Sequence, residues 1–305
     1  MPLNSSVQQF DGVRVSDAGN TTSPVIDFPI LDSLTSLAWA FSTRALRSAY
    51  TGHVIQLRRS SDNATRDFDA SASLASQIAA WAGSGDAFVT IWYDQSGNGL
   101  HASQADTTMQ PPICTAGVVN LVGGVPAPNF IGGTGLRRVL VGAAANLYAS
   151  GAGSSVAVVT GNHQGSTAVF GKEGDSGTSQ YVYGQQITGY TLTTAIRNAA
   201  GTFEQGAGTV AEIPSAFPVT QASRFTILDN GAVMKKRVRG TALADVAYTR
   251  SGSHTFTQNF IGAPSTTGTG WSGSIAELIA VKTVWDAPTL LKVENSQTNY
   301  FKIPA

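Results

Sequence analysis

The sequence predicts an all-β sandwich with one or two short helices. Its β-prone residues fall in short runs, and 33 glycines are spread through the 305 residues, above the usual share of about 7%. Each run has the length typical of a strand in such a fold. The clearest runs are residues 155–160, 180–183, 190–194, 224–228 and 274–281.

A tight turn between two of the expected strands is the clearest local signal. Asp229, Asn230 and Gly231 separate the run ending at Leu228 from the one beginning at Val233. Asn and Gly tolerate the positive φ angles that a hairpin turn requires. The sequence therefore predicts a β-hairpin centred on residues 229–231.

Two segments have helical rather than β spacing. Leu74, Ile78 and Trp81 follow one another at i, i+4 and i+7, which predicts an amphipathic helix over residues 72–82. Near the C-terminus, Asp286 is a suitable N-cap and Pro288 suits a first helical turn. We expect a terminal helix that begins there and closes the sandwich.

The chain divides into an N-terminal part and one large domain. Residues 1–33 are polar and turn-rich, so we expect an arm or an added pair of strands, with an edge strand of the same sandwich as the alternative. Residues 34–305 are expected to form the sandwich domain itself. An arm of this size often docks on a neighbouring subunit.

The composition excludes several classes of function. Nineteen Lys and Arg balance nineteen Asp and Glu, which argues against a basic nucleic-acid-binding face. The single cysteine, Cys114, excludes an intramolecular disulfide and a cysteine-based zinc site. No stretch has the length and hydropathy of a membrane span, and the first residues lack the pattern of a signal peptide. No cofactor and no metal site are expected.

Four stretches carry a family resemblance. They are residues 41–52 (FSTRALRSAYTG), 58–65 (RRSSDNAT), 89–99 (VTIWYDQSGNG) and 271–280 (WSGSIAELIA). The first three resemble the opening of the α-L-arabinofuranosidase B catalytic domain, and they also resemble phage and prophage virion proteins of the concanavalin-like lectin/glucanase jelly-roll class. The last resembles the closing strand of that jelly-roll superfamily. The resemblance implies a concanavalin-like jelly roll.

The resemblance also implies where catalytic carboxylates should lie. Retaining glycosidases need two carboxyl groups about 5 to 5.5 Å apart, and the family resemblance places them within residues 190–198 and 260–265. Neither stretch contains Asp or Glu, and the family's vicinal cysteine pair is impossible with one cysteine. We therefore expect no catalytic residue, although a shifted alignment leaves Glu204, Glu212 or Asp229 as an alternative.

Four charged residues in the opening motifs are candidates for a site. Arg58, Arg59, Asp62 and Asp94 are opposite charges in a chain with few charges, so we expect a structural hydrogen-bonded network that holds two loops together. The alternative is that the two aspartates form a carboxylate pair for catalysis or for calcium. His101 has no second ligand at metal-binding spacing and is interpreted as a loop histidine.

A second set of candidates lies in the later strands. Glu277 shares a strand face with two isoleucines, so we expect it to pair with an arginine of the opening motif. The alternative is a functional acid on the concave sheet. Aromatic rings can stack on sugars, which makes Trp271, Tyr181, Tyr183 and Tyr190 candidate glycan contacts. Core packing is the alternative for all four.

Together these features favour a structural role. A sandwich without its catalytic carboxylates, in a chain without a signal peptide, predicts a phage virion protein of the tail fibre, tail tip or head surface, located in the particle. Other virion proteins, a homo-oligomer such as a trimer, and a host surface glycan are the expected partners, with neither nucleic acid nor a membrane among them. An active α-L-arabinofuranosidase and a carbohydrate-binding lectin module are the alternatives.

Overall fold

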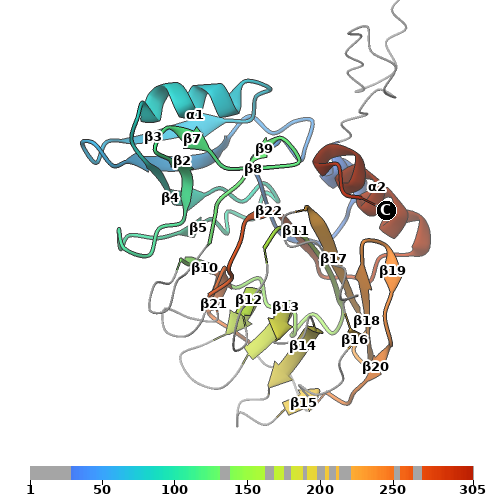
Figure 1. Cartoon of the computed structure of the whole chain (residues 1–305). Coiled ribbons are helices and arrows are strands. Elements are labelled where there is room, and N and C mark those ends of the chain that lie inside the picture. Colours follow the sequence, from blue (N-terminus) through green and yellow to red (C-terminus); the bar gives the residue numbers. More distant parts are fainter. Residues whose placement is uncertain are drawn as a thin grey trace, which may run out of the picture.

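The computed structural model describes residues 29–304 except 131–137, 162–167, 175–179, 188–190, 198–202, 206–210, 213–220, 251–254 and 264–269. Two antiparallel sheets face each other, and two helices lie on the outside (Figure 1). The predicted all-β sandwich is confirmed. Residues 1–28 lie outside the described part, so the expected arm stays a prediction.

The smaller main sheet has seven strands in the order β1-β22-β11-β17-β18-β19, with β20 beside β18. Its central strands β11, β17 and β22 are buried along their whole length. The bounds are β1 Leu37–Ser42, β11 Gly153–Val159, β17 Ser223–Asp229, β18 Val233–Val238, β19 Thr241–Ala242, β20 Val246–Ala247 and β22 Ile275–Val281.

The larger sheet has thirteen strands, with a main path β15-β14-β13-β12-β21-β10-β5-β4-β2-β3. Strand β16 pairs with β14, β6 with β4, and β7 with β6, while β8 and β9 form a separate ribbon. The bounds are β2 His53–Arg59, β3 Thr65–Asp69, β4 Ala87–Trp92, β5 Ala102–Ser103, β6 Pro112–Thr115, β7 Val118–Val119, β8 Leu121–Val122, β9 Val125–Pro126, β10 Leu140–Ala143, β12 Ala168–Gly174, β13 Gln180–Ile187, β14 Thr191–Arg197, β15 Phe203–Gln205, β16 Ala211–Glu212 and β21 Gln258–Ile261.

Both helices form where the sequence predicts them. Helix α1 spans Leu74–Ala82 and ends at Gly83, which has a positive φ of 63°. Helix α2 spans Ala287–Phe301, and the Asp286 side chain accepts a hydrogen bond from the Thr289 amide. A side-chain acceptor at this position satisfies an N–H group that the helix itself leaves free. A short 3-10 helix, η1, covers Ile30–Ser33.

The hairpin between β17 and β18 also confirms its prediction. The Asn230 side chain accepts hydrogen bonds from the amides of Ala232 and Val233, and Gly231 has a φ of 87°. These contacts close the turn at the end of β17 and fix the position of Asp229, the last residue of that strand.

The core between the sheets is rich in large aromatic side chains. Trp39, Trp92 and Trp271 are fully buried, and the Trp39 and Tyr183 rings lie 4.9 Å apart across the two sheets. Burial of such rings contributes a large share of the apolar area removed from water. The sandwich is therefore held mainly by contacts between sheets.

A buried ion pair joins the opening motif to the closing strand. Arg44 donates to both carboxylate oxygens of Glu277, at 2.7 and 3.0 Å, and both side chains are almost fully buried. Gln297 of α2 donates to the same carboxylate at 3.0 Å. The predicted pairing of Glu277 with an arginine of the opening motif is confirmed.

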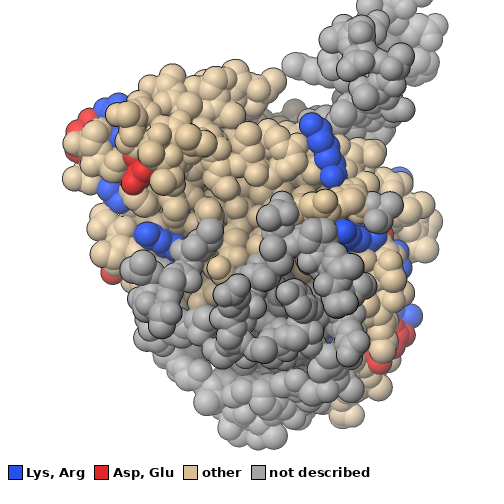
Figure 2. Space-filling model, in the orientation of Figure 1, with Lys and Arg blue, Asp and Glu red and all other residues tan. Residues whose placement is uncertain are grey.

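Charged side chains of the described residues are sparse on the face that Figure 2 draws. Figure 2 shows Lys, Arg, Asp and Glu of the described residues scattered on one face in small groups of both signs. This distribution fits a chain with nineteen charges of each sign.

Removal of one member of the Arg44 and Glu277 pair should destabilise the fold strongly. We expect Arg44→Met to lower the free energy of unfolding by about 3–5 kcal/mol, because it leaves the Glu277 carboxylate buried without its cation. Urea unfolding of the variant and the wild type measures the difference. The double variant Arg44→Met with Glu277→Leu should recover part of the loss, and equal losses in the single and double variants would contradict this assignment.

Candidate functional site

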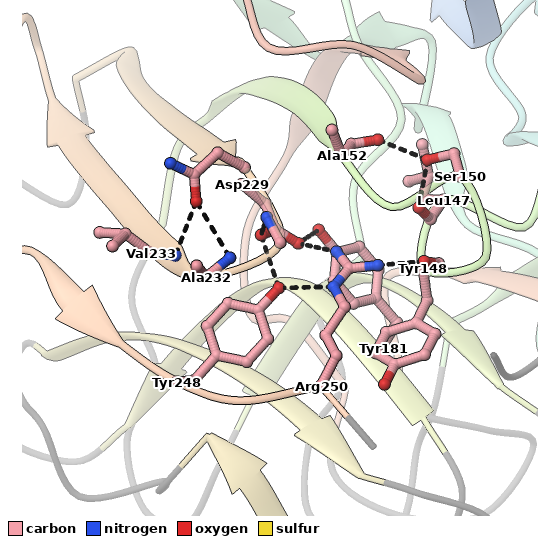
Figure 3. A network of polar contacts seen from close by, with 12 residues as sticks. Leu147, Tyr148, Ser150, Ala152, Tyr181, Asp229, Ala232, Val233, Tyr248 and Arg250 are labelled. Carbon is pink, nitrogen blue, oxygen red and sulfur yellow. Dashed lines mark hydrogen bonds and ion pairs between the residues drawn. The ribbon is translucent and has the colours of Figure 1, made fainter. Parts of the chain in front are cut away.

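A buried carboxylate at the end of β17 is the centre of a polar network between the sheets. Asp229 is fully buried and accepts a hydrogen bond from the Gly231 amide at 2.8 Å. Its oxygens also accept from the hydroxyls of Tyr248 at 2.6 Å and Tyr181 at 3.2 Å. Arg250 donates to it at 2.6 Å (Figure 3). Asp229 thus has a cation and three neutral donors.

Arg250 connects this carboxylate to a neighbouring segment of chain. Its guanidinium lies 4.5 Å from the centre of the Tyr148 ring and donates to the Tyr148 carbonyl. Burial lowers the pKa of Arg250, but the charge of Asp229 and the contact with Tyr248 outweigh burial and leave the pKa raised. Burial, together with Asp229, also raises the pKa of Tyr181 and Tyr248. Arg250 is therefore charged and both tyrosines are neutral at neutral pH.

A second buried carboxyl group lies on β12. Glu173 is fully buried and accepts hydrogen bonds from the amides of Ala145 at 2.7 Å and Leu147 at 2.8 Å. Burial raises its pKa to about 7, even though these backbone donors and Lys282 act in the opposite direction. A carboxyl group with such a pKa is half-protonated near neutral pH, which suits a general acid.

The strand register places Glu173 in a row of polar side chains. Its Cα partners are Asn259 on β21 and Tyr181 on β13, so the three side chains project from the same face of the sheet. Tyr181 in turn donates to Asp229 on the opposite sheet. Nearby, Tyr183 donates to the Asn259 side-chain oxygen, while the Asn259 side-chain nitrogen has no hydrogen-bond partner among the described residues.

The two carboxyl groups lie under one segment. Residues 144–152 connect β10 to β11, and they contact Glu173 through the amides of Ala145 and Leu147 and Arg250 through Tyr148. One carboxyl group carries a proton near neutral pH, and the other is balanced by an arginine. This combination can serve as an acid and a carboxylate base or nucleophile, provided that the segment moves to admit a substrate.

The four charged residues of the opening motifs do not form a single network. Arg59 and Asp62 make an exposed ion pair at 2.6 Å within the β2 and β3 hairpin, and Arg58 donates to Gln110 and Asn63. The prediction of a network that includes Asp94 is wrong, because this carboxylate is buried elsewhere and is satisfied by backbone amides and a serine.

Asp94 holds the segment that follows β4 against β1. It accepts from the Ala40 amide at 2.8 Å and from the amides of Ser96 and Leu100. His101 accepts from the Asp94 amide through Nδ1 at 3.0 Å. These contacts explain the YDQSGNG motif as a structural loop. Asp62 and Asp94 have separate partners, so they are not a joint calcium or catalytic site.

The candidate glycan contacts are covered by protein. Trp271 is fully buried and donates to the Thr160 carbonyl, while Tyr181 and Tyr183 are each 3% exposed. Their rings contribute to the core, which was the alternative interpretation, and no glycan reaches them without a rearrangement. Tyr190 lies outside the described residues.

The described part of the chain has neither a metal-binding cluster nor a membrane-spanning helix. No group of three or more His, Cys, Asp or Glu side chains there is arranged to hold a metal ion. None of the helices in the described ranges is long and apolar enough to cross a membrane.

Comparison with known proteins identifies the family. Residues 33–209, more than half of the chain, match the family described as "Alpha-L-arabinofuranosidase B, catalytic". The chain belongs to this family. The matched region contains Glu173 and all strands from β1 to β15, whereas Asp229 and Arg250 follow it.

Individual relatives agree with this assignment. An α-L-arabinofuranosidase B of Penicillium canescens is 31% identical over 171 residues, which cover 49% of this chain and 37% of that protein. A probable α-L-arabinofuranosidase B of Aspergillus flavus is 39% identical over 99 residues, covering 30% of this chain and 19% of that protein. The chain thus spans well under half the length of these curated relatives.

Solved structures support the fold. A crystal structure of an arabinofuranosidase complexed with arabinofuranosyl-α-1,2-xylobiose has a TM-score of 0.61 at 17% identity, covering 89% of this chain and 64% of that one. The structure of a GH54 α-L-arabinofuranosidase soaked with a cyclic sulfate inhibitor has a TM-score of 0.60 at 18% identity. It also covers 89% of this chain and 64% of that one. At such identity the likeness concerns the fold alone.

The comparisons overturn the hypothesis of a phage structural protein. The matched family is a catalytic domain and the relatives are named as fungal arabinofuranosidases, so the expectations of a virion protein, of location in the particle and of a chain without enzyme activity are wrong. The resemblance to the arabinofuranosidase family is confirmed, and the resemblance to phage proteins receives no support from these matches. The expected oligomer, arm contacts and glycan partner stay predictions.

Sequence reasoning found Asp229 only as an alternative and missed Glu173. The GKEG sequence of residues 171–174 contained a usable signal, because a carboxyl group within a β-prone run in a chain with few charges needs buried partners. The partners of Glu173 are the backbone amides of Ala145 and Leu147. Every residue except proline has such an amide, so the pattern of side chains in the sequence does not show which amides bind Glu173.

The Asp229 and Arg250 pair should contribute strongly to stability. We expect Asp229→Asn to lower the free energy of unfolding by about 3 kcal/mol, because Arg250 is left as a largely buried and unbalanced charge. Chemical denaturation is the measurement. Asp245→Asn is the matched control, since the ion pair of Asp245 with Lys235 is about half exposed and surface ion pairs contribute little to stability. Equal losses of unfolding free energy in the two variants would contradict the importance of the buried pair.

Proposed function

We propose that the chain is a glycoside hydrolase that acts on α-L-arabinofuranosides. The observation that carries this proposal is the match of residues 33–209 to the arabinofuranosidase B catalytic family. The relatives named for this activity support the same reaction class. The substrate remains part of the proposal, because the chain covers only part of those proteins.

The carboxyl groups for this reaction would come from positions that the family resemblance did not indicate. Residues 190–198 and 260–265 contain no Asp or Glu. These stretches overlap β14 and β21, which are in the same sheet as β12. Among the buried carboxyl groups of the described residues, Glu173 lies on β12, between β13 and β21, and Asp229 is joined to the same region by Tyr181.

The environments of the two groups suit different roles. Glu173, with a pKa of about 7, would protonate the leaving oxygen of the glycoside. Asp229, with Arg250 and three neutral donors around it, would stabilise the positive charge that develops at the anomeric carbon or attack that carbon. Two carboxyl groups kept in different protonation states are the general requirement of glycoside hydrolysis.

The activity is tested with 4-nitrophenyl α-L-arabinofuranoside. The wild type should release nitrophenol, and Glu173→Gln and Asp229→Asn should each lower kcat by about 10² or more. Asp62→Asn, which alters only an exposed ion pair, should leave kcat unchanged. Circular dichroism confirms that each variant is folded. No release by a folded wild-type protein at high concentration would contradict the proposal.

The pH profile gives an independent check. We expect kcat to fall as the pH rises through about 7, since Glu173 must carry a proton to act as the acid. A profile that is flat from pH 6 to pH 8 in the wild type would exclude this role for Glu173, even if the protein were active.

A further inference from the structure

The ends of three strands of the larger sheet bring aromatic and acidic side chains together on an exposed surface. His53 begins β2 and lies opposite Asp69, the last residue of β3. Tyr93 follows β4 directly, and its amide donates to the Val54 carbonyl of β2. Strand pairing therefore places His53, Asp69 and Tyr93 close together, near one end of the sheet (Figure 1).

These side chains lie on the opposite face of the sheet from helix α1. The Phe68 ring packs edge-on against Trp81 of α1, with ring centroids 5.6 Å apart. Side chains alternate along a strand, so Asp67 and Asp69, on either side of Phe68, point away from the helix. The side chains of His53 and Asp69 are 50% and 69% exposed, and that of Asp67 is 33% exposed. This surface is open to solvent.

Three aromatic rings meet on this surface. The centroid of the Tyr93 ring lies 5.9 Å from that of His53 and 5.0 Å from that of His101. His101 is exposed, and its Nδ1 accepts from the Asp94 amide, so the neutral ring carries its proton on Nε2. The result is an aromatic platform with an N–H donor beside it. Aromatic rings of this kind can stack on the apolar face of a sugar.

The two carboxylates have oxygens that remain free to accept hydrogen bonds. Asp67 Oδ1 accepts from the Tyr93 hydroxyl at 2.7 Å and from Gln56 Nε2 at 3.0 Å. Asp67 Oδ2 lies 4.0 Å from His53 Nε2, which is beyond hydrogen-bond distance. Asp69 Oδ1 is 2.6 Å from His53 Nδ1, and Asp69 Oδ2 has no partner among the described residues. Free acceptors beside an aromatic ring match the hydroxyl groups of a carbohydrate.

The charge of this surface narrows the class of ligand. Asp67 and Asp69 are acidic, and no Lys or Arg of the described residues lies within ion-pair distance of either. An anionic ligand would therefore be repelled. The described part of the chain has no group of three His, Cys, Asp or Glu side chains that could hold a metal ion. A neutral molecule with many hydroxyl groups fits this surface best.

Neighbouring contacts hold the groups of this surface in place. Thr90 donates to the Gln56 side chain at 2.9 Å, and Gln56 in turn donates to Asp67. The Tyr50 hydroxyl donates to the His53 carbonyl at 2.7 Å. Side chains that are already ordered lose less conformational entropy when a ligand binds.

We propose that Tyr93, His53, His101, Asp67 and Asp69 form a surface site for a neutral carbohydrate chain. A sugar ring stacks on Tyr93, its hydroxyls donate to the free aspartate oxygens, and His101 Nε2 donates to it. The site is separate from the buried polar network, because β4 lies four places from β12 in the strand order, or about 19 Å at about 4.8 Å per strand. Binding needs no cleavage, so the site does not depend on the proposed hydrolase activity.

Binding of xylohexaose, a neutral oligosaccharide, to the full chain tests the site. A titration followed by NMR should shift the ring signals of Tyr93, His53 and His101. Tyr93→Ala should weaken binding about tenfold, because it removes the stacking ring, and Asp69→Ala should weaken it about fivefold, because it removes a hydrogen-bond acceptor. Asp62→Ala is the matched control for Asp69→Ala, since Asp62 is an exposed aspartate that pairs with Arg59 instead, and it should bind like the wild type.

Hexagalacturonate, which carries a carboxylate on each sugar, tests the charge argument and should bind more weakly than xylohexaose. Ring signals of Tyr93, His53 and His101 that stay unchanged at high xylohexaose concentration would overturn the site. So would wild-type affinity in a folded Tyr93→Ala variant, or tighter binding of hexagalacturonate than of xylohexaose. Because no nitrophenol release is measured, loss of the hydrolase proposal would leave this site intact, and absence of xylohexaose binding would contradict only the site.

Discussion

Burial of charge in the interior, between the two sheets and beneath helix α2, is the constraint on which the rest of the structure depends. Glu277 has Arg44, and Asp229 has Arg250. Glu294 has Arg224 and Arg237. Each carboxylate thereby avoids the cost of an unpaired buried ion. Glu173 differs, because backbone amides are its hydrogen-bond partners and burial raises its pKa.

The paired groups and the unpaired group have different consequences. The Arg44 and Glu277 pair connects the opening motif, the closing strand and, through Gln297, helix α2. This ion pair stabilises the sandwich as long as both partners are present. Glu173 instead places a group that titrates near neutral pH beneath a short connecting segment. Stability and sensitivity to pH therefore reside in different parts of the same interior.

The sequence predicted the fold well because local signals determine it. The Asp229, Asn230 and Gly231 turn, the cap at Asp286 and the run over residues 274–281 are each specified by neighbouring residues, and all three are found. The pairing of Glu277 was also predictable, since an acid on an apolar strand face requires a buried cation.

The site was harder to predict because it depends on contacts between distant segments. Asp229 and Tyr181 are 48 residues apart, and Glu173 and Ala145 are 28 apart. The family resemblance directed attention to two stretches without acidic residues and so led to a structural role, which the family match overturned. Arg58 and Asp94 have charges that suggested one network, but Asp94 is satisfied by backbone amides instead.

The most direct test of this account is a titration of the Glu173 side-chain carboxyl carbon by NMR, with the signal assigned by its loss in Glu173→Gln. The account predicts a midpoint near pH 7 in the folded chain. A midpoint near the ordinary value of 4.5 would mean that burial does not hold a proton on this group, and it would contradict the acid role.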